Sequence, residues 1–432
     1  MPDISNSRRF ATVVNHLGEH DDGRFSHTMP IYQTSTFGFV DVEDAGAVLG
    51  DRTKGRYVYT RGSNPNARHL ATKIAYLEGM DLIAAAPERD PAEIVAGEVT
   101  SSGLAAIACV ALTFLKAGDT AIVQAAAYGG ALSFWETVVP RYGVKTVFVH
   151  GTDPESWAAA LNANPDARIV YLETPSTPLL RIYDLSAIVK MAHGIGALCV
   201  VDNTAATPYH QRPLSFGADY VVHSTTKYIN GHGLQIGGAI VSRHVETMIV
   251  GGAVWNTVVF HGTTPSPNDC WLSNNGLKTL ELRMQRHSAN ALELAEFLEK
   301  QDAIARVFYP GLASSPDHDL ARRQMHNGFS GLVSFEVEGG AENALSLMKH
   351  LRLPIIASSF GTTDSLIQHP GTMSHSYMTE EQKQASGITP GLIRMSVGIE
   401  AIDDLMEDFE RALKIMRDLW PSQDLSRGIR HG

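Results

Sequence analysis

Short apolar runs alternate with helix-length stretches through the middle of the chain. The runs are rich in β-branched residues and occupy 120–124, 144–150, 168–174, 198–204, 219–225 and 237–243, while 129–142, 155–163 and 184–195 have the length of helices. Strands that are apolar on both faces and separated by helices are typical of a mostly parallel sheet with helices on either side. The pattern therefore predicts an α/β fold, in which functional residues collect at the carboxyl ends of the strands.

The last third of the chain has a different pattern. A long amphipathic helix is expected from Gly276 to about Gln301, followed by a strand within 329–339 and helices over 341–350 and 402–418. This order predicts a smaller α+β domain.

The first residues, up to about 62, are rich in turn formers and aromatics and show no sustained period. Such a segment is expected to be an arm that lies across a neighbouring domain or subunit. Because 432 residues are too many for one compact core, more than one domain is expected. We predict an arm at 1–62, a large domain at 63–270 and a small C-terminal domain at 271–432.

Charge and composition narrow the classes of partner. Hydrophobic residues make up 44% and charged residues 19% of the chain, and 35 basic against 46 acidic residues give a net charge of −11. Without a dense basic stripe, nucleic acids and anionic membranes are disfavoured as partners. No apolar stretch approaches a membrane span and Met1 to Phe10 lack the apolar core of a signal peptide, so a cytoplasmic location is expected.

Cysteine and histidine spacing gives no metal-binding motif. Cys109, Cys199 and Cys270 are far apart in apolar or mixed surroundings, which predicts free thiols in a reducing compartment rather than a disulfide framework or a zinc site. His16 and His20 have helical spacing but no accompanying H-E-x-x-H pattern. We therefore expect no metal centre.

The segment VVHSTTKYINGHG places a lysine just after a predicted strand. Lys227 follows Ser224, Thr225 and Thr226, whose hydroxyl groups can donate hydrogen bonds to a phosphate. A lysine that forms a Schiff base must be neutral for part of its cycle, which burial and nearby positive charge favour. Taken alone, the pattern is equally compatible with a surface lysine after a strand.

Three further elements carry related chemistry. Asp202, in LCVVDNT, lies at the carboxyl end of a strand, where a carboxylate can keep a pyridine nitrogen protonated and make the ring an electron sink. The turn in TSSGLAAI opens a helix whose first amides, those of Gly103 and Leu104, would point at an anion. Tyr128 lies just beyond another strand and could stack on a flat heteroaromatic ring. Taken one at a time, the three motifs are explained equally well as a turn former, a helix cap and a core tyrosine. Together with Lys227 they predict a site for pyridoxal 5'-phosphate.

The order of these motifs resembles that of the Cys/Met-metabolism family of pyridoxal-phosphate enzymes, which includes cystathionine γ-synthase, cystathionine and methionine γ-lyases and O-acetylhomoserine sulfhydrylase. The resemblance runs from about Thr28 to Asp408 and implies the aspartate-aminotransferase-like fold type I. It rests on PIYQTSTF (30–37), YTRGSNP (59–65), SSGLAAI, YGG (128–130), ETPSTPL (173–179), VDNT, HSTTKYINGHG, GLKTLELRMQRH (276–287), SSFGTTDSLIQHP (358–370) and IRMSVGIE (393–400).

The resemblance implies roles around the cofactor. Lys227 would carry it as a Schiff base and later shuttle protons. Asp202 would pair with the pyridine nitrogen, and Tyr128 would stack on the ring and assist proton transfer or departure of the leaving group. The groups that hold the phosphate would be those of Gly103, Leu104, Ser224 and Thr226.

The resemblance also implies a substrate site and an assembly. Arg394 would clamp the substrate α-carboxylate in a fork-like pair, helped by Ser359. Tyr59 and Arg61, on the arm, would reach the cofactor phosphate of a neighbouring subunit. The expected assembly is therefore a homotetramer built from dimers that share active sites.

The chain departs from the family pattern at several positions. Asn is usual where this chain has Thr177, near the cofactor's 3-oxygen, and a hydroxyl residue is usual where it has Ala131. Many γ-lyases and γ-synthases carry Asp where this chain has Leu234, and Arg or Gln is common at Asn275. An insertion at 80–100, which contains APERDPAEIV, is expected to form a surface loop.

The expected chemistry is removal of an α-proton and a β-proton followed by loss of a γ-substituent. Because GHG-x-x-IGG resembles the sulfhydrylase branch, we predict γ-replacement on an O-acylhomoserine-type amino acid, giving homocysteine or a related product. The alternative is a γ-lyase that releases a 2-oxo acid and ammonia from methionine, cystathionine or an alkoxy amino acid such as canavanine. A NAD-binding oxidoreductase would share the sheet pattern, but G-x-G-x-x-G is missing after the first strand. A catalytically inactive binding protein would leave Lys227, Asp202 and Arg394 without a role.

Overall fold

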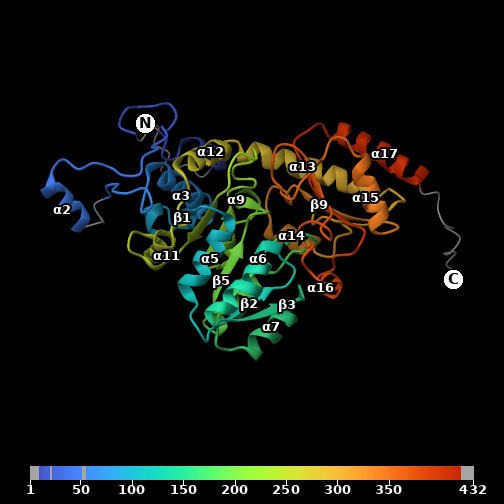
Figure 1. The fold of residues 1–432 in the computed structure, drawn as a ribbon, viewed down its shortest axis with the longest axis horizontal. Helices are drawn as coiled ribbons and strands as arrows, with labels where there is room; N and C mark the ends of the chain where they lie inside the picture. Colours follow the sequence, from blue (N-terminus) through green and yellow to red (C-terminus); the bar gives the residue numbers. More distant parts are fainter. Residues whose placement is uncertain (1–8, 20–21, 51–54, 420–432) are drawn as a thin grey trace.

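The computed structural model describes residues 9–19, 22–50 and 55–419, and within them a seven-stranded sheet forms the centre of the large domain (Figure 1). The strand order is β1-β7-β6-β5-β4-β2-β3. Neighbouring pairs are parallel from β3 to β6, whereas β7 is antiparallel to both β6 and β1. The strands are β1 (Ala96–Thr100), β2 (Thr120–Gln124), β3 (Lys145–Val149), β4 (Ala167–Glu173), β5 (Leu198–Asp202), β6 (Tyr220–Ser224) and β7 (Gly238–Ser242).

The sheet is buried on both faces, as the continuous apolar runs predicted. Along β4, Ile169 and Tyr171 pack into one apolar cluster, while Val170 and Leu172 pack into another on the opposite face. Successive side chains of a strand point to opposite faces, so a strand covered on both sides must be apolar throughout. All six predicted strands are confirmed, as is the mostly parallel sheet flanked by helices.

Helices surround the sheet and fill the connections between its strands. Most of the predicted helices are confirmed, including those at 155–163, 184–195, 341–350 and 402–418. The helices up to residue 200 are α1 (Phe10–His16), α2 (Val42–Gly50), α3 (Pro65–Glu78), α4 (Met80–Ala85), α5 (Gly103–Phe114), α6 (Gly129–Ser133), α7 (Pro154–Ala163) and α8 (Leu185–Gly194). Those that follow are α9 (Thr207–His210), α10 (Val245–Met248), α11 (Ala253–His261), α12 (Pro267–Leu277), α13 (Leu280–Leu298), α14 (His318–Gln324), α15 (Ala341–His350), α16 (Glu380–Ala385) and α17 (Ile402–Leu419).

Two helix predictions were wrong in their extent. The segment 129–142 is not one α-helix: after α6 the chain forms a π-helical turn and then a 3-10 turn that contains Pro140, which cannot donate an α-helical hydrogen bond. The predicted helix 276–301 is divided between α12 and α13. Arg283 fixes the break, because its guanidinium donates to Gly276 O at 2.7 Å and to Thr279 Oγ1 at 3.0 Å.

The insertion at 80–100 is only partly the surface loop that was expected. It begins with α4, continues through an exposed turn, and ends in β1, a strand that the sequence pattern missed. The strand AGEVT has no continuous apolar run and contains Glu98, whose pKa burial raises to about 7. Gly97 brings β1 against α3, since a Cβ there would lie 2.9 Å from Ala71 O.

The C-terminal part has its own sheet of order β10-β11-β12-β9-β8 and its own apolar core. Helices α13, α15 and α17 pack around this sheet, with Phe335 and Phe409 in contact at its centre. The arrangement confirms a smaller α+β domain, while the boundary at 270/271 stays a prediction. The strands are β8 (Ile304–Phe308), β9 (Leu332–Val337), β10 (Ile355–Ile356), β11 (Leu366–Gln368) and β12 (Leu392–Ser396).

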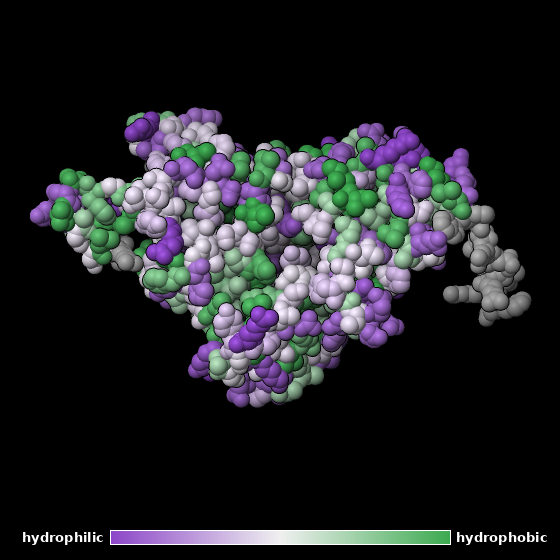
Figure 2. All heavy atoms as spheres, viewed as in Figure 1, coloured by the Kyte–Doolittle hydropathy of each residue, from purple (hydrophilic) through white to green (hydrophobic). Residues whose placement is uncertain are grey.

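The N-terminal segment contains α1, which packs against α3 and α13, and α2, which projects from the body at the left of Figure 1. Val40 and Val42 are 85% and 82% exposed, and Figure 2 shows apolar surface on this projection. A buried ion pair ties the segment after α1 to the body, because Lys73 Nζ lies 2.7 Å from Glu19 Oε1. Contact of the arm with another subunit stays a prediction.

Several sequence expectations concern membranes, metals and thiols. Across 9–19, 22–50 and 55–419 no helix is long and apolar enough to cross a membrane. The same part of the chain contains no cluster of three or more His, Cys, Asp or Glu side chains suited to a metal, and His20 lies outside the described residues. Cys109, Cys199 and Cys270 are buried free thiols.

Candidate active site

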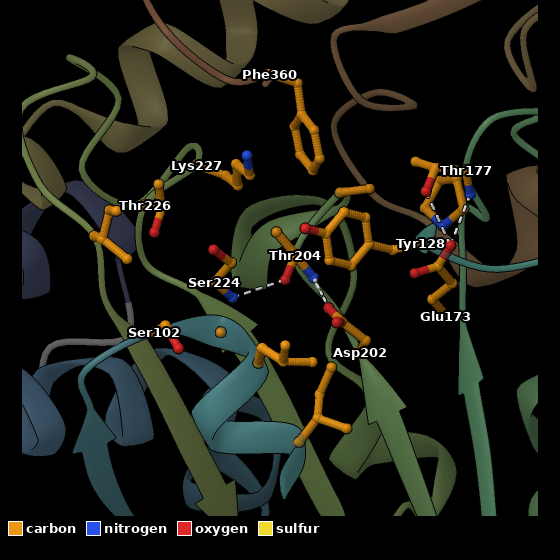
Figure 3. A pocket seen from close by; sticks show the side chains of 16 residues that line it. Ser102, Tyr128, Glu173, Thr177, Asp202, Thr204, Ser224, Thr226, Lys227 and Phe360 are labelled. Atoms are coloured by element: carbon orange, nitrogen blue, oxygen red, sulfur yellow. Dashed lines mark hydrogen bonds between the residues drawn. The ribbon is translucent and has the colours of Figure 1, made fainter. Parts of the chain in front are cut away.

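The carboxyl ends of four strands and the start of α5 surround a cavity of about 240 Å³ (Figure 3). Parallel strands present their carboxyl ends at one edge of the sheet, so the segments after β2, β4, β5 and β6 meet there. Eight of the sequence-predicted residues line this cavity. They are Gly103, Leu104, Tyr128, Thr177, Asp202, Ser224, Thr226 and Lys227.

Lys227 extends its amine into the upper part of the cavity, toward the small domain (Figure 3). Its Nζ donates to Ser359 Oγ at 2.7 Å and lies 4.9 Å from the centre of the Phe360 ring. Burial, and then the nearby Arg394 cation, lower the pKa of Lys227 to about 8. A substantial neutral fraction near neutral pH follows, as a nucleophilic lysine requires.

Arg394 lies behind the cavity, on β12, with 6% of its surface exposed. Its guanidinium donates to Ser359 O at 2.9 Å and, with the Gln368 amide turned toward it, to the Gln368 oxygen at 3.2 Å. No ion pair joins it to a carboxylate of residues 9–19, 22–50 or 55–419, and burial lowers the pKa of Arg394 to about 10. A buried cation without a counter-ion is suited to an anionic ligand.

Asp202 closes the bottom of the cavity at the end of β5. Its Oδ1 accepts from Thr204 N at 2.9 Å, and Tyr171 Oη donates to its Oδ2 at 3.4 Å. Burial raises the pKa of Asp202, so a cationic ligand nearby would favour its ionised form.

The turn before α5 forms an anion-binding corner. Ser102 caps the helix by accepting from Ala105 N at 3.1 Å, which leaves the first amides, those of Gly103 and Leu104, at the cavity wall. The helix start lies tight against β6, since a Cβ on Gly103 would be 2.6 Å from Ser224 Cβ. Thr226 Oγ1 donates to Gly237 O at 3.2 Å, so a phosphate contact from this hydroxyl requires it to turn.

Tyr128 presents its ring to the cavity with 48% of the residue exposed. Gly130 is needed beneath the ring, because a Cβ there would lie 2.6 Å from Tyr128 Cε1. The turn that follows Tyr128 is held by Tyr377, whose Oη donates to Gly129 O at 2.9 Å. The ring is therefore positioned yet free on the side of the cavity, as stacking on a ligand requires.

Sequence reasoning assigned no role to Glu173 and Phe360, although both line the cavity and both lie in quoted motifs. Glu173 Oε1 accepts from Thr177 N at 2.9 Å and from Thr177 Oγ1 at 3.0 Å. Burial, and then the Asp202 charge, raise the pKa of Glu173 to about 8. The sequence signal for Glu173 was its position as the first residue of ETPSTPL, at the end of a predicted strand.

The structure does not bring every predicted residue into this cavity. Tyr59 and Arg61 line a separate pocket with Trp255, and Arg61 lies 5.6 Å from the Tyr59 ring centre. Ser359 and Arg394 adjoin the cavity through the contacts described above without being part of its lining.

The structure gives the contacts or exposure of the four residues that depart from the family pattern. The Thr177 hydroxyl donates a hydrogen bond to Glu173, and Ala131 is fully buried. Asn275 donates to Trp271 O at 2.9 Å. Leu234 is 63% exposed beside the cavity residue Ile236.

The residues present fit pyridoxal 5'-phosphate. The cavity has an amide corner for a phosphate, an aromatic ring for stacking, a buried carboxylate that could pair with a ring nitrogen, and a lysine amine for covalent attachment. The close approach of Gly103 to Ser224 leaves no room for a side chain in the corner.

Comparison with known proteins agrees with this chemistry. The family described as Cys/Met metabolism PLP-dependent enzyme matches residues 11–414. L-methionine gamma-lyase of Fusobacterium nucleatum subsp. polymorphum is 41% identical, with 93% of this chain and 97% of the relative aligned. O-succinylhomoserine sulfhydrylase of Pseudomonas aeruginosa (strain PAO1) is 37% identical over 94% and 95% of the two chains.

Among solved structures, cystathionine gamma synthase of Xanthomonas oryzae pv. oryzae superimposes with a TM-score of 0.86 and 38% identity, covering 95% of this chain and 99% of the other. The cavity and these relationships lead to one assignment. The chain belongs to the Cys/Met metabolism family of pyridoxal-phosphate-dependent enzymes.

Proposed function

We propose that the enzyme acts at the γ-carbon of an α-amino acid whose carboxylate binds Arg394. The observation that supports this placement of the amino acid is the short connection from the buried guanidinium to the lysine amine: Arg394 donates to Ser359 O, and Ser359 Oγ accepts from Lys227. Action at the γ-carbon is proposed from the gamma-lyase and sulfhydrylase relatives. A substrate held at Arg394 by its carboxylate has its α-carbon within reach of a group that carries protons.

Lys227 and Tyr128 are the proton-handling groups in this proposal. When bound, pyridoxal phosphate supplies an electron sink that stabilises negative charge on the substrate carbons. With the cofactor and substrate bound, the Lys227 amine would take the α-proton and move protons along the substrate, for which a pKa of about 8 is suitable. Tyr128, which lines the cavity, would stack against the cofactor ring and assist departure of the γ-substituent.

The remaining residues hold the cofactor. Asp202 would face the pyridine nitrogen and keep it protonated, while Gly103, Leu104 and Ser224 would bind the phosphate at the start of α5. Thr226 contributes its hydroxyl after exchanging its bond to Gly237 O. Thr177, which donates to Glu173 Oε1 at 3.0 Å, would lie near the cofactor's 3-oxygen.

For the reaction itself we propose γ-replacement on an O-acylhomoserine, with a sulfide or thiol as acceptor. The part of the cavity wall formed by Leu104 and Ile236 is apolar, and these residues are 39% and 64% exposed. Such a wall suits a neutral acyl ester better than a side chain with a second charged amino-acid group. O-succinylhomoserine sulfhydrylase of Pseudomonas aeruginosa, at 37% identity, is a relative with replacement chemistry.

The second candidate is γ-elimination, as in the methionine gamma-lyases that are up to 41% identical. The same apolar wall suits a methylthio group, and elimination requires only that water rather than a thiol completes the reaction. The oxidoreductase alternative is overturned by membership of a pyridoxal-phosphate family.

The deciding experiment incubates the holoenzyme with O-acetylhomoserine, with and without sulfide, and measures homocysteine and 2-oxobutanoate. Sulfide-dependent homocysteine is the expected product. Production of 2-oxobutanoate alone, even with sulfide present, would refute replacement and favour elimination. A parallel panel of methionine, cystathionine and canavanine then identifies the γ-substituent.

We also propose a cytoplasmic homotetramer of dimers that share active sites. Tyr59 and Arg61 are outside the cavity of their own chain, and α2 offers apolar surface for a partner. Mixing Lys227→Ala chains with Arg61→Ala chains should restore activity, because hybrid dimers contain one intact site. A monomer in light scattering, or mixed chains with no more activity than the separate variants, would refute sharing.

A further inference from the structure

The Phe360 ring lies beside two cationic side chains, the partly buried Lys227 and the buried Arg394. Its centre is 4.9 Å from Lys227 Nζ and 5.4 Å from Arg394 Cζ, and only 7% of the residue is exposed. Figure 3 shows the ring next to the lysine amine at the top of the cavity. The ring is held in place by Tyr228, whose own ring centre is 5.8 Å away. The next residue, Gly361, has φ +84°, and a Cβ there would lie 2.7 Å from Tyr228 N.

The two cations need a compensating group. Within the part of the chain that the structure describes, neither Lys227 nor Arg394 is ion-paired with a carboxylate, and the charge of Arg394 itself disfavours the ammonium form of Lys227. The face of an aromatic ring carries partial negative charge and attracts a cation within about 6 Å. Phe360 satisfies that distance for both groups.

A carboxylate in the same place would interfere with the reaction. It would occupy Arg394, which is proposed to bind the substrate carboxylate, and it would accept protons from Lys227. An aromatic ring stabilises both cations while offering neither a proton acceptor nor a competing anion.

We propose that Phe360 is a positioning residue, whose ring holds the Lys227 ammonium and the Arg394 guanidinium in place so that the lysine retains a proton between successive transfers. This inference rests on the roles proposed for these two residues. The other polar groups that face Lys227 are Ser359, beside it, and Tyr128, Glu173 and Asp202 across the cavity. None of these is altered in the variants that test the proposal.

The test measures the protonation of Lys227 without requiring catalysis. The full-length chain is freed of cofactor and treated with an amine-acylating reagent between pH 6 and 10. Mass spectrometry then gives the labelling rate of the peptide that contains Lys227, since only the neutral amine reacts. Phe360→Leu and Phe360→Met remove the ring, Phe360→Tyr keeps it, and Phe134→Leu is a matched control that removes a ring of similar burial, 6% exposed, outside the cavity.

Loss of the ring should lower the labelling midpoint by about one pH unit, which is about tenfold more neutral amine below the midpoint. Phe360→Tyr and Phe134→Leu should keep the wild-type midpoint. The proposal is overturned if Phe360→Leu or Phe360→Met titrates like wild type, or if Phe360→Tyr shifts as far as they do. Two ring-removing variants keep the test usable if one fails to fold. Because no turnover is measured, failure of the γ-replacement assay would leave this result unaffected.

Discussion

Arg394→Met should abolish most activity without destabilising the apoenzyme. Removing one partner of a buried, hydrogen-bonded charge pair costs about 2–5 kcal/mol, so kcat/KM should fall by roughly 30-fold to several thousandfold. The loss should appear with any substrate that has an α-carboxylate, because Arg394 is expected to bind that group.

The stability effect follows from the missing counter-ion. Burial lowers the pKa of Arg394 from its ordinary value to about 10, which corresponds to about 3 kcal/mol against the charged form. Because the folded pKa lies below the ordinary value, this term opposes folding throughout the neutral range. Methionine removes this term, and the Gln368 oxygen keeps Ser374 Oγ as a donor at 3.1 Å. Ser359 O, however, is left without its Arg394 donor, at a cost of about 1–3 kcal/mol. The free energy of unfolding should therefore stay constant or rise by up to about 2 kcal/mol.

Arg283 provides the matched control. It is also buried, and burial lowers the pKa of Arg283 to about 10 as well, so the relief from removing the charge is the same. Its three hydrogen bonds, however, all serve the fold, two of them to the carbonyls of Tyr228 and Gly276 at 2.7 Å. Arg283→Met should therefore be less stable than Arg394→Met by about 1–3 kcal/mol.

Urea unfolding of the apoenzymes and steady-state kinetics of the holoenzymes are the two measurements. The reasoning is refuted if Arg394→Met is as unstable as Arg283→Met while losing less than about tenfold in kcat/KM, a loss of about 1 kcal/mol. Arg394 would then be a structural residue, and the substrate carboxylate would bind elsewhere.

Three further predictions concern the cofactor and the arm. Lys227→Ala should lose the visible absorption of the bound cofactor, whereas Lys190→Ala, at an exposed position on α8, should keep it. Gly103→Ala should raise the cofactor Kd by roughly 10- to 100-fold in absorbance titrations, because its Cβ would lie 2.6 Å from Ser224 Cβ. Burial by itself would raise the pKa of Glu19, but the neighbouring lysine and amide groups outweigh it and lower this pKa to about 2. Stability from this pair should be complete above about pH 4.5 and lost as pH falls toward 2, and Glu19→Gln should flatten that dependence in urea unfolding.

The strand positions were predictable because burial on both faces leaves a continuous apolar run, as in β4 and β5. The strand β1 was missed for the opposite reason: AGEVT carries the half-buried Glu98 and a glycine that contacts α3. The break near 277–279 was missed because an arginine later in the chain fixes it. Such tertiary hydrogen bonds leave no periodic signal.

For the site, the sequence by itself determined the chemical types and their order: an amide turn, a tyrosine, an aspartate and a lysine, each at the end of a buried strand or the start of a helix. Parallel topology brings those ends together, so eight predicted residues share one cavity. Only the tertiary structure decided that Phe360 contacts both Lys227 and Arg394, that Glu173 anchors Thr177, and that Tyr59 and Arg61 lie outside their own chain's cavity. The reason is physical: strand ends follow from local pattern, whereas the approach of two domains and the absence of a counter-ion depend on how distant segments pack.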